Sequence, residues 1–180
     1  MPNLDRAGGA NVEEAARRLF GILSERGLRL VCAESCTGGI VSSAITDISG
    51  SSSVLWGGVV AYSNECKTRL LGVPQAALAE YGAVSREVVR EMARGALEAA
   101  KEADIALAIS GIAGPEGGSR EKPVGLVWFA FRTAGIGAEG IRDVESFEES
   151  LTFAGDRKAV REAAAAHAIL RAAELAREFR

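Results

Sequence analysis

Residues 34–39, Glu-Ser-Cys-Thr-Gly-Gly, join an apolar segment to an apolar-periodic one and place a hydroxyl beside a thiol. Ser35 can serve such a junction in two ways. It can cap the following helix by accepting a hydrogen bond from a free backbone N–H, and position alone favours this role because caps are far commoner than nucleophiles. It can instead be a nucleophile, because N–H groups at a helix start, together with Gly38 and Gly39, can hold a developing oxyanion.

Cys36 is a competing nucleophile in the same turn. A cysteine at a helix N-terminus has a lowered pKa, but its usual partner in catalysis is a histidine. The chain holds a single histidine, His167, within an alanine-rich segment that is typical of a helix, where a packed or surface role is favoured over catalysis. We therefore rank Ser35 above Cys36 and expect a general base other than histidine.

The segment Tyr-Ser-Asn-Glu-Cys-Lys at 62–67 offers that base. We expect Tyr62 to end a strand, Asn64 to cap the next helix and Lys67 to lie in its first turn. The positive end of a helix and desolvation both lower the pKa of a lysine, and a neutral lysine can take a proton from a serine. Position alone favours a solvated surface lysine, but the joint pattern with Ser35 indicates a Ser-Lys pair.

A glycine-rich, charged loop runs from Ser110 to Gly125. Its free backbone N–H groups around 117–120, with the charge of Arg120 or Lys122, are typical of a phosphate or carboxylate site, although a mobile surface loop explains the same composition equally well. It matches neither the Walker nor the dinucleotide glycine pattern. Further on, Asp156 is placed to cap the last helix, and Arg157 is either exposed or reaches into the site.

Composition limits the function classes. The 180 residues are 48% hydrophobic and 25% charged, as expected for one soluble globular domain. A net charge of −3 with dispersed Lys and Arg argues against nucleic-acid binding. No stretch approaches the roughly 20 apolar residues of a membrane span, and the first 14 residues lack the pattern of a secretory signal, so we expect a cytoplasmic protein. Three cysteines and one histidine argue against a disulfide framework and a conventional metal site, and we expect no cofactor.

Helices and strands alternate early in the chain, and strands follow one another later. This order predicts a single three-layer α/β/α domain with a mixed sheet over 12–180, after a flexible N-terminus at 1–11. The predicted helices cover 12–26, 40–48, 64–71, 85–103 and 156–179. The predicted strands cover 28–34, 54–63, 104–111, 126–134 and, more exposed, 144–155, and the glycine pair at 57–58 indicates a bulge or close backbone approach.

In an open α/β sheet, functional groups gather at the carboxyl ends of the strands. Four segments fall there in the predicted arrangement: 33–39, 61–67, 109–125 and 153–157. We therefore expect Ser35, Lys67, the glycine-rich loop and Arg157 to border one cleft.

The motifs AESCTGG, YSNECKTRLLGV, YGAVSREVV, SGIAGPEGGSREKPVG and a late GDR with a following VR occur in this order. In that order they resemble the C-terminal domain of the competence-damage-inducible CinA family, whose stand-alone members are nicotinamide-nucleotide amidases. The resemblance covers nearly the whole chain from about Val12.

The resemblance implies an amidohydrolase that uses no metal and converts nicotinamide mononucleotide and water to nicotinic acid mononucleotide and ammonia. It places the family's catalytic serine, tyrosine and lysine on Ser35, Tyr62 and Lys67. The turn that holds the oxyanion then comprises Cys36, Thr37, Gly38 and Gly39. The substrate-binding residues would be Asn64, Ser110, Gly111, Gly114, Gly117, Gly118, Lys122 and Arg157.

Two positions depart from the family pattern. Ser110 replaces the commoner threonine, and Arg120 stands where proline is frequent, which bears on loop stiffness or substrate affinity. The nucleotide-binding-like N-terminal domain of full-length CinA is expected to be absent, and a homodimer is expected from the family and the apolar last helix. Two alternatives stay open: a pyridine-nucleotide-binding paralogue without turnover, and an amidase of the same mechanism acting on another small amide. A role in DNA uptake has no support in the charge pattern.

Overall fold

The structure, a computed structural model, describes residues 11–136 and 142–179. The predicted flexible segment 1–11 lies outside the described residues except for Asn11, which caps the first helix. The helices are α1 (Val12–Arg26), α2 (Ile40–Thr46), α3 (Asn64–Leu71), α4 (Gln75–Tyr81), α5 (Arg86–Ala99) and α6 (Arg157–Glu178), with a short 3-10 helix at Ser51–Ser53. The strands are β1 (Leu30–Glu34), β2 (Leu55–Val60), β3 (Ile105–Gly111), β4 (Leu126–Ile136) and β5 (Arg142–Thr152).

The strands form one mixed sheet, as predicted, and their order in it is β2-β1-β3-β4-β5. β1 pairs in parallel with both β2 and β3, and β4 and β5 add antiparallel strands. All five residues of β1 are buried, because helices cover both faces of the sheet at this strand. The carboxyl end of β1 therefore lies between the ends of β2 and β3, where parallel strands deliver their following loops to one edge.

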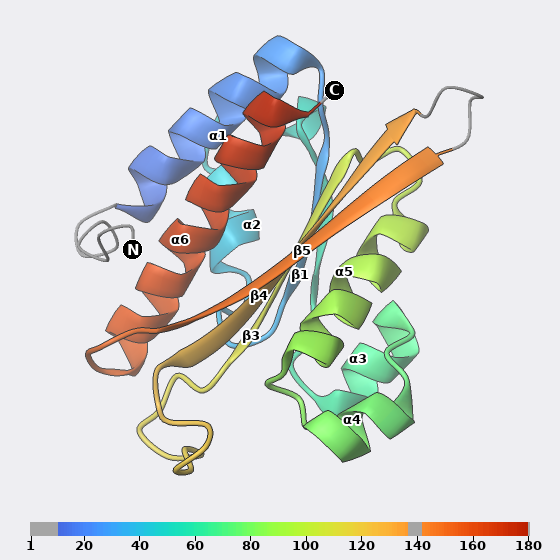
Figure 1. The fold of residues 1–180 in the computed structure, drawn as a ribbon. Coiled ribbons are helices and arrows are strands. Elements are labelled where there is room, and N and C mark those ends of the chain that lie inside the picture. Colours follow the sequence, from blue (N-terminus) through green and yellow to red (C-terminus); the bar gives the residue numbers. More distant parts are fainter. Residues whose placement is uncertain (1–10, 137–141, 180) are drawn as a thin grey trace.

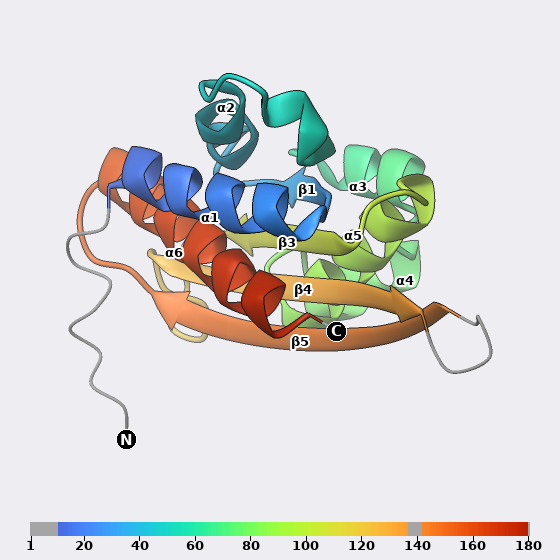
Figure 2. The same cartoon turned by 90° about the horizontal axis from the view of Figure 1, so that it is seen from above.

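Helices cover both faces of the sheet, which confirms the predicted three-layer α/β/α arrangement (Figures 1 and 2). α1, α2 and α6 pack over one face, around an apolar cluster that includes Leu19, Ile45 and Ile169. α5 with α3 packs over the other face, around a second cluster that includes Val89 and Met92. α1 and α6 lie side by side in both views. Burial of these two apolar clusters is the main favourable contribution to folding.

Local signals set the helix ends. Asn11 accepts a hydrogen bond from the Glu13 N–H at 3.0 Å, and α1 ends at Gly27 in the left-handed conformation, as its periodicity predicts. Asp156 caps α6 by accepting from the Ala159 N–H at 2.8 Å, as predicted. The prediction that Asn64 caps α3 is wrong. Ser63 is the cap and accepts from the Cys66 N–H at 3.0 Å. Both residues are good caps, and Asn64 is the first residue of the helix rather than the residue before it.

Helix α4 and the irregular pairing of β2 differ in how well the sequence predicted them. α4 was not predicted. None of its residues is fully buried, and only Ala77 and Leu78 pack partly against the core, so its apolar stripe is too short to identify it as a helix. In β2 the pairing register with β1 shifts, because Leu30 pairs with Leu55 and Val31 with Gly57. The irregularity at this glycine pair confirms the predicted bulge.

Gly95 of α5 lies directly against the last residue of α3. A Cβ at Gly95 would lie 1.8 Å from the Leu71 carbonyl oxygen and 2.6 Å from its carbonyl carbon. No side chain fits at such a distance, so only glycine lets the two helices meet here. The contact fixes how closely α3, and the lysine that it carries, approaches α5.

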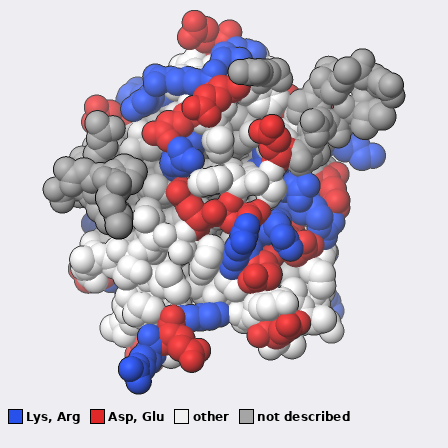
Figure 3. All heavy atoms as spheres, in the orientation of Figure 1, with Lys and Arg blue, Asp and Glu red and all other residues white. Residues whose placement is uncertain are grey.

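Basic and acidic side chains are intermixed on the face of the molecule shown in Figure 3. Among the residues that the structure describes, no helix is both long and apolar enough to cross a membrane.

Candidate active site

Ser35 and Lys67 meet although 32 positions separate them in the sequence. Lys67 Nζ lies 3.0 Å from Ser35 Oγ. Ser35 directly follows β1, and Lys67 lies in α3, which follows the parallel neighbour β2. Only 1% of the Lys67 surface and 8% of the Ser35 surface is exposed. The two side chains therefore form a buried hydroxyl–amine pair at the carboxyl edge of the sheet, where the sequence placed them.

The surroundings of the Lys67 amine are uncharged but polar. Besides Ser35 Oγ, Nζ contacts two backbone carbonyls, Ala61 O at 2.8 Å and Tyr62 O at 3.3 Å. A neutral amine has two N–H groups and one lone pair, so it can donate to both carbonyls and accept the hydroxyl proton of Ser35. Burial lowers the pKa of Lys67, because desolvation disfavours the charged ammonium. The geometry and the pKa direction both suit a general base.

Cys36 is a poor candidate for the nucleophile in this setting. Burial raises the pKa of its thiol to about 11, although backbone N–H groups and the charges of Lys67 and Arg161 act in the opposite direction. The sulfur is therefore a protonated thiol near neutral pH, and a thiol is a weak nucleophile. This outcome agrees with the ranking of Ser35 above Cys36, though for burial rather than for want of a histidine.

Glu34 holds the turn that carries Ser35, and sequence reasoning gave it no role. Its carboxylate accepts from the backbone N–H groups of Gly39, Val41 and Ser42 at 2.9–3.1 Å, and from the Ser42 hydroxyl at 2.7 Å. A carboxylate at the start of α2 suits the positive end of the helix. Gly58 of β2 leaves room for this contact, because a Cβ there would lie 2.4 Å from Ser42 Oγ.

The alternative role of Ser35 as a helix cap is excluded by this arrangement. α2 begins at Ile40 with Gly39 as its cap residue, and the carboxylate of Glu34 supplies the side-chain oxygens that Ser35 would have supplied. Ser35 is thereby free to turn its hydroxyl toward Lys67.

The oxyanion turn predicted at 36–39 needs a correction. The Gly38 N–H donates to Ser35 O at 3.0 Å and the Gly39 N–H to Glu34, so neither is free for an oxyanion. The N–H groups of Cys36 and Thr37 instead approach the Cys36 sulfur. Thr37 Oγ1 is buried and has no hydrogen-bond partner within 11–136 and 142–179, and an unpaired buried hydroxyl is typical of a site that takes a ligand.

Tyr62 lies at the site but contacts Lys67 by its backbone. The resemblance implies a catalytic role for Tyr62, but its hydroxyl forms no hydrogen bond to Lys67. The hydroxyl accepts from Arg157 Nη2 at 2.8 Å, and only the Tyr62 carbonyl faces the amine. Arg157 Nη1 also donates to Gly114 O at 2.8 Å. The structure therefore joins Tyr62, Arg157 and Gly114 at the rim of the site, and 60% of the tyrosine surface stays exposed.

The other residues predicted to bind substrate have different surroundings. Ser110 is buried and its hydroxyl donates to Ala83 O at 2.7 Å, so it is engaged within the fold. Lys122 Nζ donates to Tyr81 O at 2.6 Å, so it is bonded to the C-terminal residue of α4. Asn64 is exposed in the first turn of α3, and its side chain has no hydrogen bond within the described part of the chain. None of these three side chains contacts Ser35 or Lys67.

The predicted glycines differ in role. A Cβ at Gly111 would lie 2.9 Å from the Leu126 carbonyl oxygen, and one at Gly118 would lie 2.8 Å from the Val124 backbone nitrogen. Both positions therefore serve the close packing of the loop. Gly117 is exposed in the loop, and Gly114, with its carbonyl on Arg157, is the one that joins the rim.

Arg161 was missed by sequence reasoning, although it is the arginine of the late VR motif. Its Nε donates to Cys36 O at 3.0 Å and its Nη2 to Thr37 O at 2.8 Å. It lies one helical turn after Arg157, and a four-residue spacing behind a capped helix start was the available signal that both face the same way.

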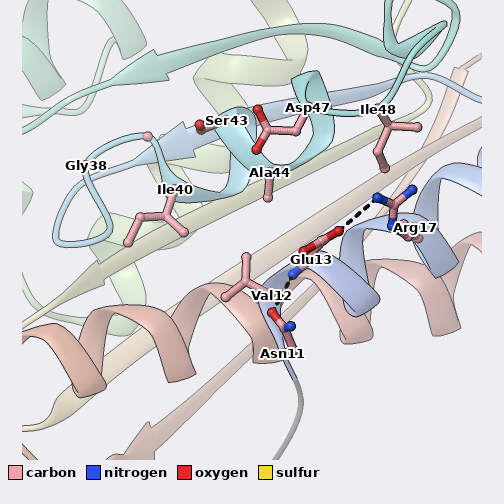
Figure 4. A pocket seen from close by; sticks show the side chains of 11 residues that line it. Asn11, Val12, Glu13, Arg17, Gly38, Ile40, Ser43, Ala44, Asp47 and Ile48 are labelled. Carbon is pink, nitrogen blue, oxygen red and sulfur yellow. Dashed lines mark hydrogen bonds and ion pairs between the residues drawn. The ribbon is translucent and has the colours of Figure 1, made fainter.

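An open groove of about 690 Å³ borders the turn on the side of α1 and α2 (Figure 4). It is lined by Asn11, Val12, Glu13, Arg17, Gly38, Gly39, Ile40, Ser43, Ala44, Asp47 and Ile48. Glu13 and Arg17 pair with each other across its edge at 2.8 Å. Its lining includes neither Ser35 nor Lys67, so the groove borders the turn at Gly38 and Gly39 but not the reactive pair.

Comparisons with known proteins agree on one relationship. A family model described as the CinA C-terminal domain matches residues 12–176. The Escherichia coli K12 protein named nicotinamide-nucleotide amidohydrolase PncC is 56% identical over 147 residues, which cover 82% of this chain and 84% of that protein. A CinA-like protein of Geobacter sulfurreducens is 48% identical over 163 residues, and these cover 90% of this chain but only 36% of that longer protein. The crystal structure of competence damage-inducible protein A (ComA) from Klebsiella pneumoniae superposes with a TM-score of 0.85 at 36% identity, covering 94% of this chain and 99% of that chain.

Proposed function

The chain belongs to the CinA C-terminal domain family, and on that premise we propose that it hydrolyses the carboxamide of nicotinamide mononucleotide. The products are nicotinic acid mononucleotide and ammonia. The name of the Escherichia coli relative supports the substrate. The observation that carries the reaction type is the 3.0 Å contact between Ser35 Oγ and the buried amine of Lys67.

In the first half of the reaction, Ser35 Oγ attacks the carboxamide carbon and its proton passes to neutral Lys67 Nζ. The electron pair of the C=O double bond moves onto oxygen, which gives a tetrahedral oxyanion. When the oxyanion collapses, the C–N bond breaks and the leaving nitrogen takes the proton from Lys67, so ammonia departs. Ser35 is left as an acyl ester, and Lys67 is neutral again.

In the second half, water replaces ammonia. Neutral Lys67 takes a proton from the attacking water, the new tetrahedral intermediate collapses, and Ser35 recovers its proton from Lys67 as the acid leaves. One water is consumed per turnover and no metal takes part. A lysine whose pKa is lowered by burial suits this cycle, because it must accept and return a proton in each half.

The rim residues account for preference toward a nucleotide. The exposed ring of Tyr62 can stack on the pyridine ring. Arg157 holds the Tyr62 hydroxyl and the Gly114 carbonyl, and its guanidinium can pair with the substrate phosphate in a bidentate manner. We therefore assign Arg157, rather than Lys122, to the phosphate, because Lys122 is bonded to Tyr81 O away from this rim.

The test is the release of ammonia from nicotinamide mononucleotide, with the product identified by its mass increase of about one unit. We expect Ser35→Ala and Lys67→Ala to lose on the order of 100-fold or more in turnover. Lys158→Ala is the matched control, because Lys158 is a surface lysine with 80% of its side chain exposed. Circular dichroism verifies that each variant is folded.

The phosphate is tested with substrate fragments. Nicotinamide and its riboside should react much more slowly than the mononucleotide, and Arg157→Gln should narrow that gap by raising KM for the mononucleotide alone. Equal turnover of all three would instead indicate an amidase for another small amide. No turnover of any of them, in the folded wild-type protein, would rule out the proposed activity.

A further inference from the structure

Arg161 binds the backbone of the turn that carries the nucleophile. Its guanidinium is half-buried and spans two successive carbonyls, Cys36 O at 3.0 Å from Nε and Thr37 O at 2.8 Å from Nη2. A Cβ at Gly38 would lie 3.2 Å from Nη2, so the guanidinium packs directly against the turn. No other described side chain bonds to these two carbonyls.

Fixing a carbonyl also fixes the N–H of the same peptide group. In a trans peptide the C=O and the following N–H point in opposite directions. The bond from Arg161 to Cys36 O therefore turns the Thr37 N–H away from α6. The bond to Thr37 O likewise turns the Gly38 N–H away, and that N–H donates to Ser35 O. One guanidinium thus sets the orientation of two peptide planes beside Ser35.

The remaining donors of the turn are accounted for. Gly39, Val41 and Ser42 give their N–H groups to the carboxylate of Glu34. A carboxylate thus holds the amides on the helix side of the turn, while the guanidinium holds the carbonyls on the α6 side. The Cys36 and Thr37 N–H groups are left next to the sulfur of Cys36, one residue from the attacking hydroxyl.

We propose that Arg161 is a positioning residue for the oxyanion formed on Ser35. Its bond to Cys36 O orients the Thr37 N–H directly, and its bond to Thr37 O orients the Gly38 N–H, whose bond to Ser35 O in turn fixes the Cys36 N–H. The proposal rests on the proposed acyl transfer to Ser35, but not on the identity of the amide. A preorganised N–H donor stabilises the transition state more than the ground state. The positive charge of Arg161 also acts at this place, since it helps to lower the pKa of the Cys36 thiol and thereby favours negative charge there.

The first measurement compares kcat and KM of Arg161→Gln and Arg161→Lys with those of the wild type. We expect kcat of Arg161→Gln to fall by roughly 100-fold while KM changes by less than about threefold, because the lost stabilisation belongs to the transition state. Arg161→Lys keeps the charge, but a single ammonium cannot span both carbonyls as the planar guanidinium does. It should therefore retain only part of the activity.

Chemical rescue distinguishes the positioning role of Arg161 from a purely structural one, because only the positioning role predicts that added guanidinium restores kcat. Arg161→Ala leaves a space that free guanidinium ion can enter, and millimolar guanidinium should restore part of kcat in this variant but not in Ser35→Ala. Lys158→Gln removes one positive charge from the same helix and should leave kcat and KM unchanged. Arg161→Gln with kcat within threefold of wild type, or with its whole loss in KM, overturns the proposal.

A second substrate separates this proposal from the proposed function. p-Nitrophenyl acetate is an activated ester whose cleavage by Ser35 also passes through an oxyanion but needs no nucleotide. If wild type cleaves this ester in a Ser35-dependent manner and Arg161→Gln loses that activity, the role of Arg161 stands even where nicotinamide mononucleotide is not a substrate. Ester cleavage that is unchanged by Arg161→Gln, or that never depends on Ser35, overturns it.

Discussion

Two groups of polar side chains in this molecule contain basic residues in opposite surroundings, one group buried around Lys67 and one partly buried around Glu149. In the site, the amine of Lys67 meets a hydroxyl and two carbonyls. Between β5 and α6, the carboxylate of Glu149 meets His167 Nε2 at 2.8 Å and Arg171 Nε at 3.4 Å. The amine of Lys67 is thus surrounded by neutral partners, whereas His167 and Arg171 share a carboxylate partner.

The pKa directions show what this difference does. Burial lowers the pKa of Lys67, so the amine gives up its proton readily. Burial raises the pKa of Glu149, but the hydrogen bond from His167 and the charges of His167 and Arg171 outweigh it, and the net pKa is lowered. A buried cation with neutral partners is thus made ready for proton transfer, whereas an ion cluster fixes its charges and contributes to stability.

The ring contacts of the β5–α6 cluster support a structural role. His167 packs on Phe129 with ring centroids 4.9 Å apart, and the guanidinium of Arg171 lies 5.0 Å from the Phe147 ring centroid. The single histidine of the chain is therefore engaged in packing and in one hydrogen bond to Glu149, which agrees with the expectation that it has a packed role.

The sharpest test of the contrast replaces one cation in each group by methionine. Lys67→Met should lower turnover by roughly 100-fold or more, yet raise the melting temperature, because it removes a buried ionisable group. Arg171→Met should keep its turnover within about twofold of wild type but have a lower melting temperature. Steady-state kinetics and thermal unfolding measure both. The contrast fails if Arg171→Met loses activity as severely as Lys67→Met.

The second test concerns Glu34, the one carboxylate of the site turn. Glu34→Ala removes the acceptor of three backbone N–H groups and one hydroxyl, so we expect a loss of about 2–3 kcal/mol in the free energy of unfolding together with lower kcat. Glu34→Gln should lose less, because an amide oxygen still accepts. Urea unfolding gives the free energies, and a Glu34→Ala protein of wild-type stability would contradict this account of the turn.

The third test is the pH dependence of the rate. Because only neutral Lys67 can accept the proton, kcat/KM should rise about tenfold per pH unit and level off at the lowered pKa, below the ordinary lysine value of about 10.4. The same shift has a sign for stability. Between the lowered pKa and the ordinary one, the unfolded chain binds the extra proton, so Lys67 makes the fold less stable at low pH than at high pH. If kcat/KM levelled off only at the ordinary lysine pKa, the pKa of Lys67 would not be lowered in the folded protein.

The smallest expected effect belongs to the ion cluster. Glu149→Gln should lower the free energy of unfolding by about 1 kcal/mol at pH 7, since the carboxylate is only partly buried and screening discounts its pairs. The folded-state pKa of Glu149 is lowered, so its contribution is present above the unfolded value of about 4.3 and is lost as the pH falls through the folded value. Unfolding curves of the two proteins should converge in acid, and kcat should not change.

The sequence allowed a good part of the site to be predicted for a physical reason. Ser35 follows β1 and Lys67 follows β2, and parallel neighbours end at one edge, so their proximity depends only on strand pairing. The contact of Arg161 with Cys36 O could not be predicted in the same way, because it depends on the rotation of α6 about its own axis. The role of Glu34 depends on the turn conformation, and α4 buries none of its residues fully, so its apolar pattern is weak.

The contact between Gly95 and Leu71 influences the Lys67 amine from outside the active site. The two helix backbones touch there, so even one methyl group would act as a spacer and lift the lysine-bearing helix toward water. The proton affinity of the amine follows its depth. A substitution at Gly95 can therefore shift the pH range in which the protein is active while every group that touches the substrate stays the same.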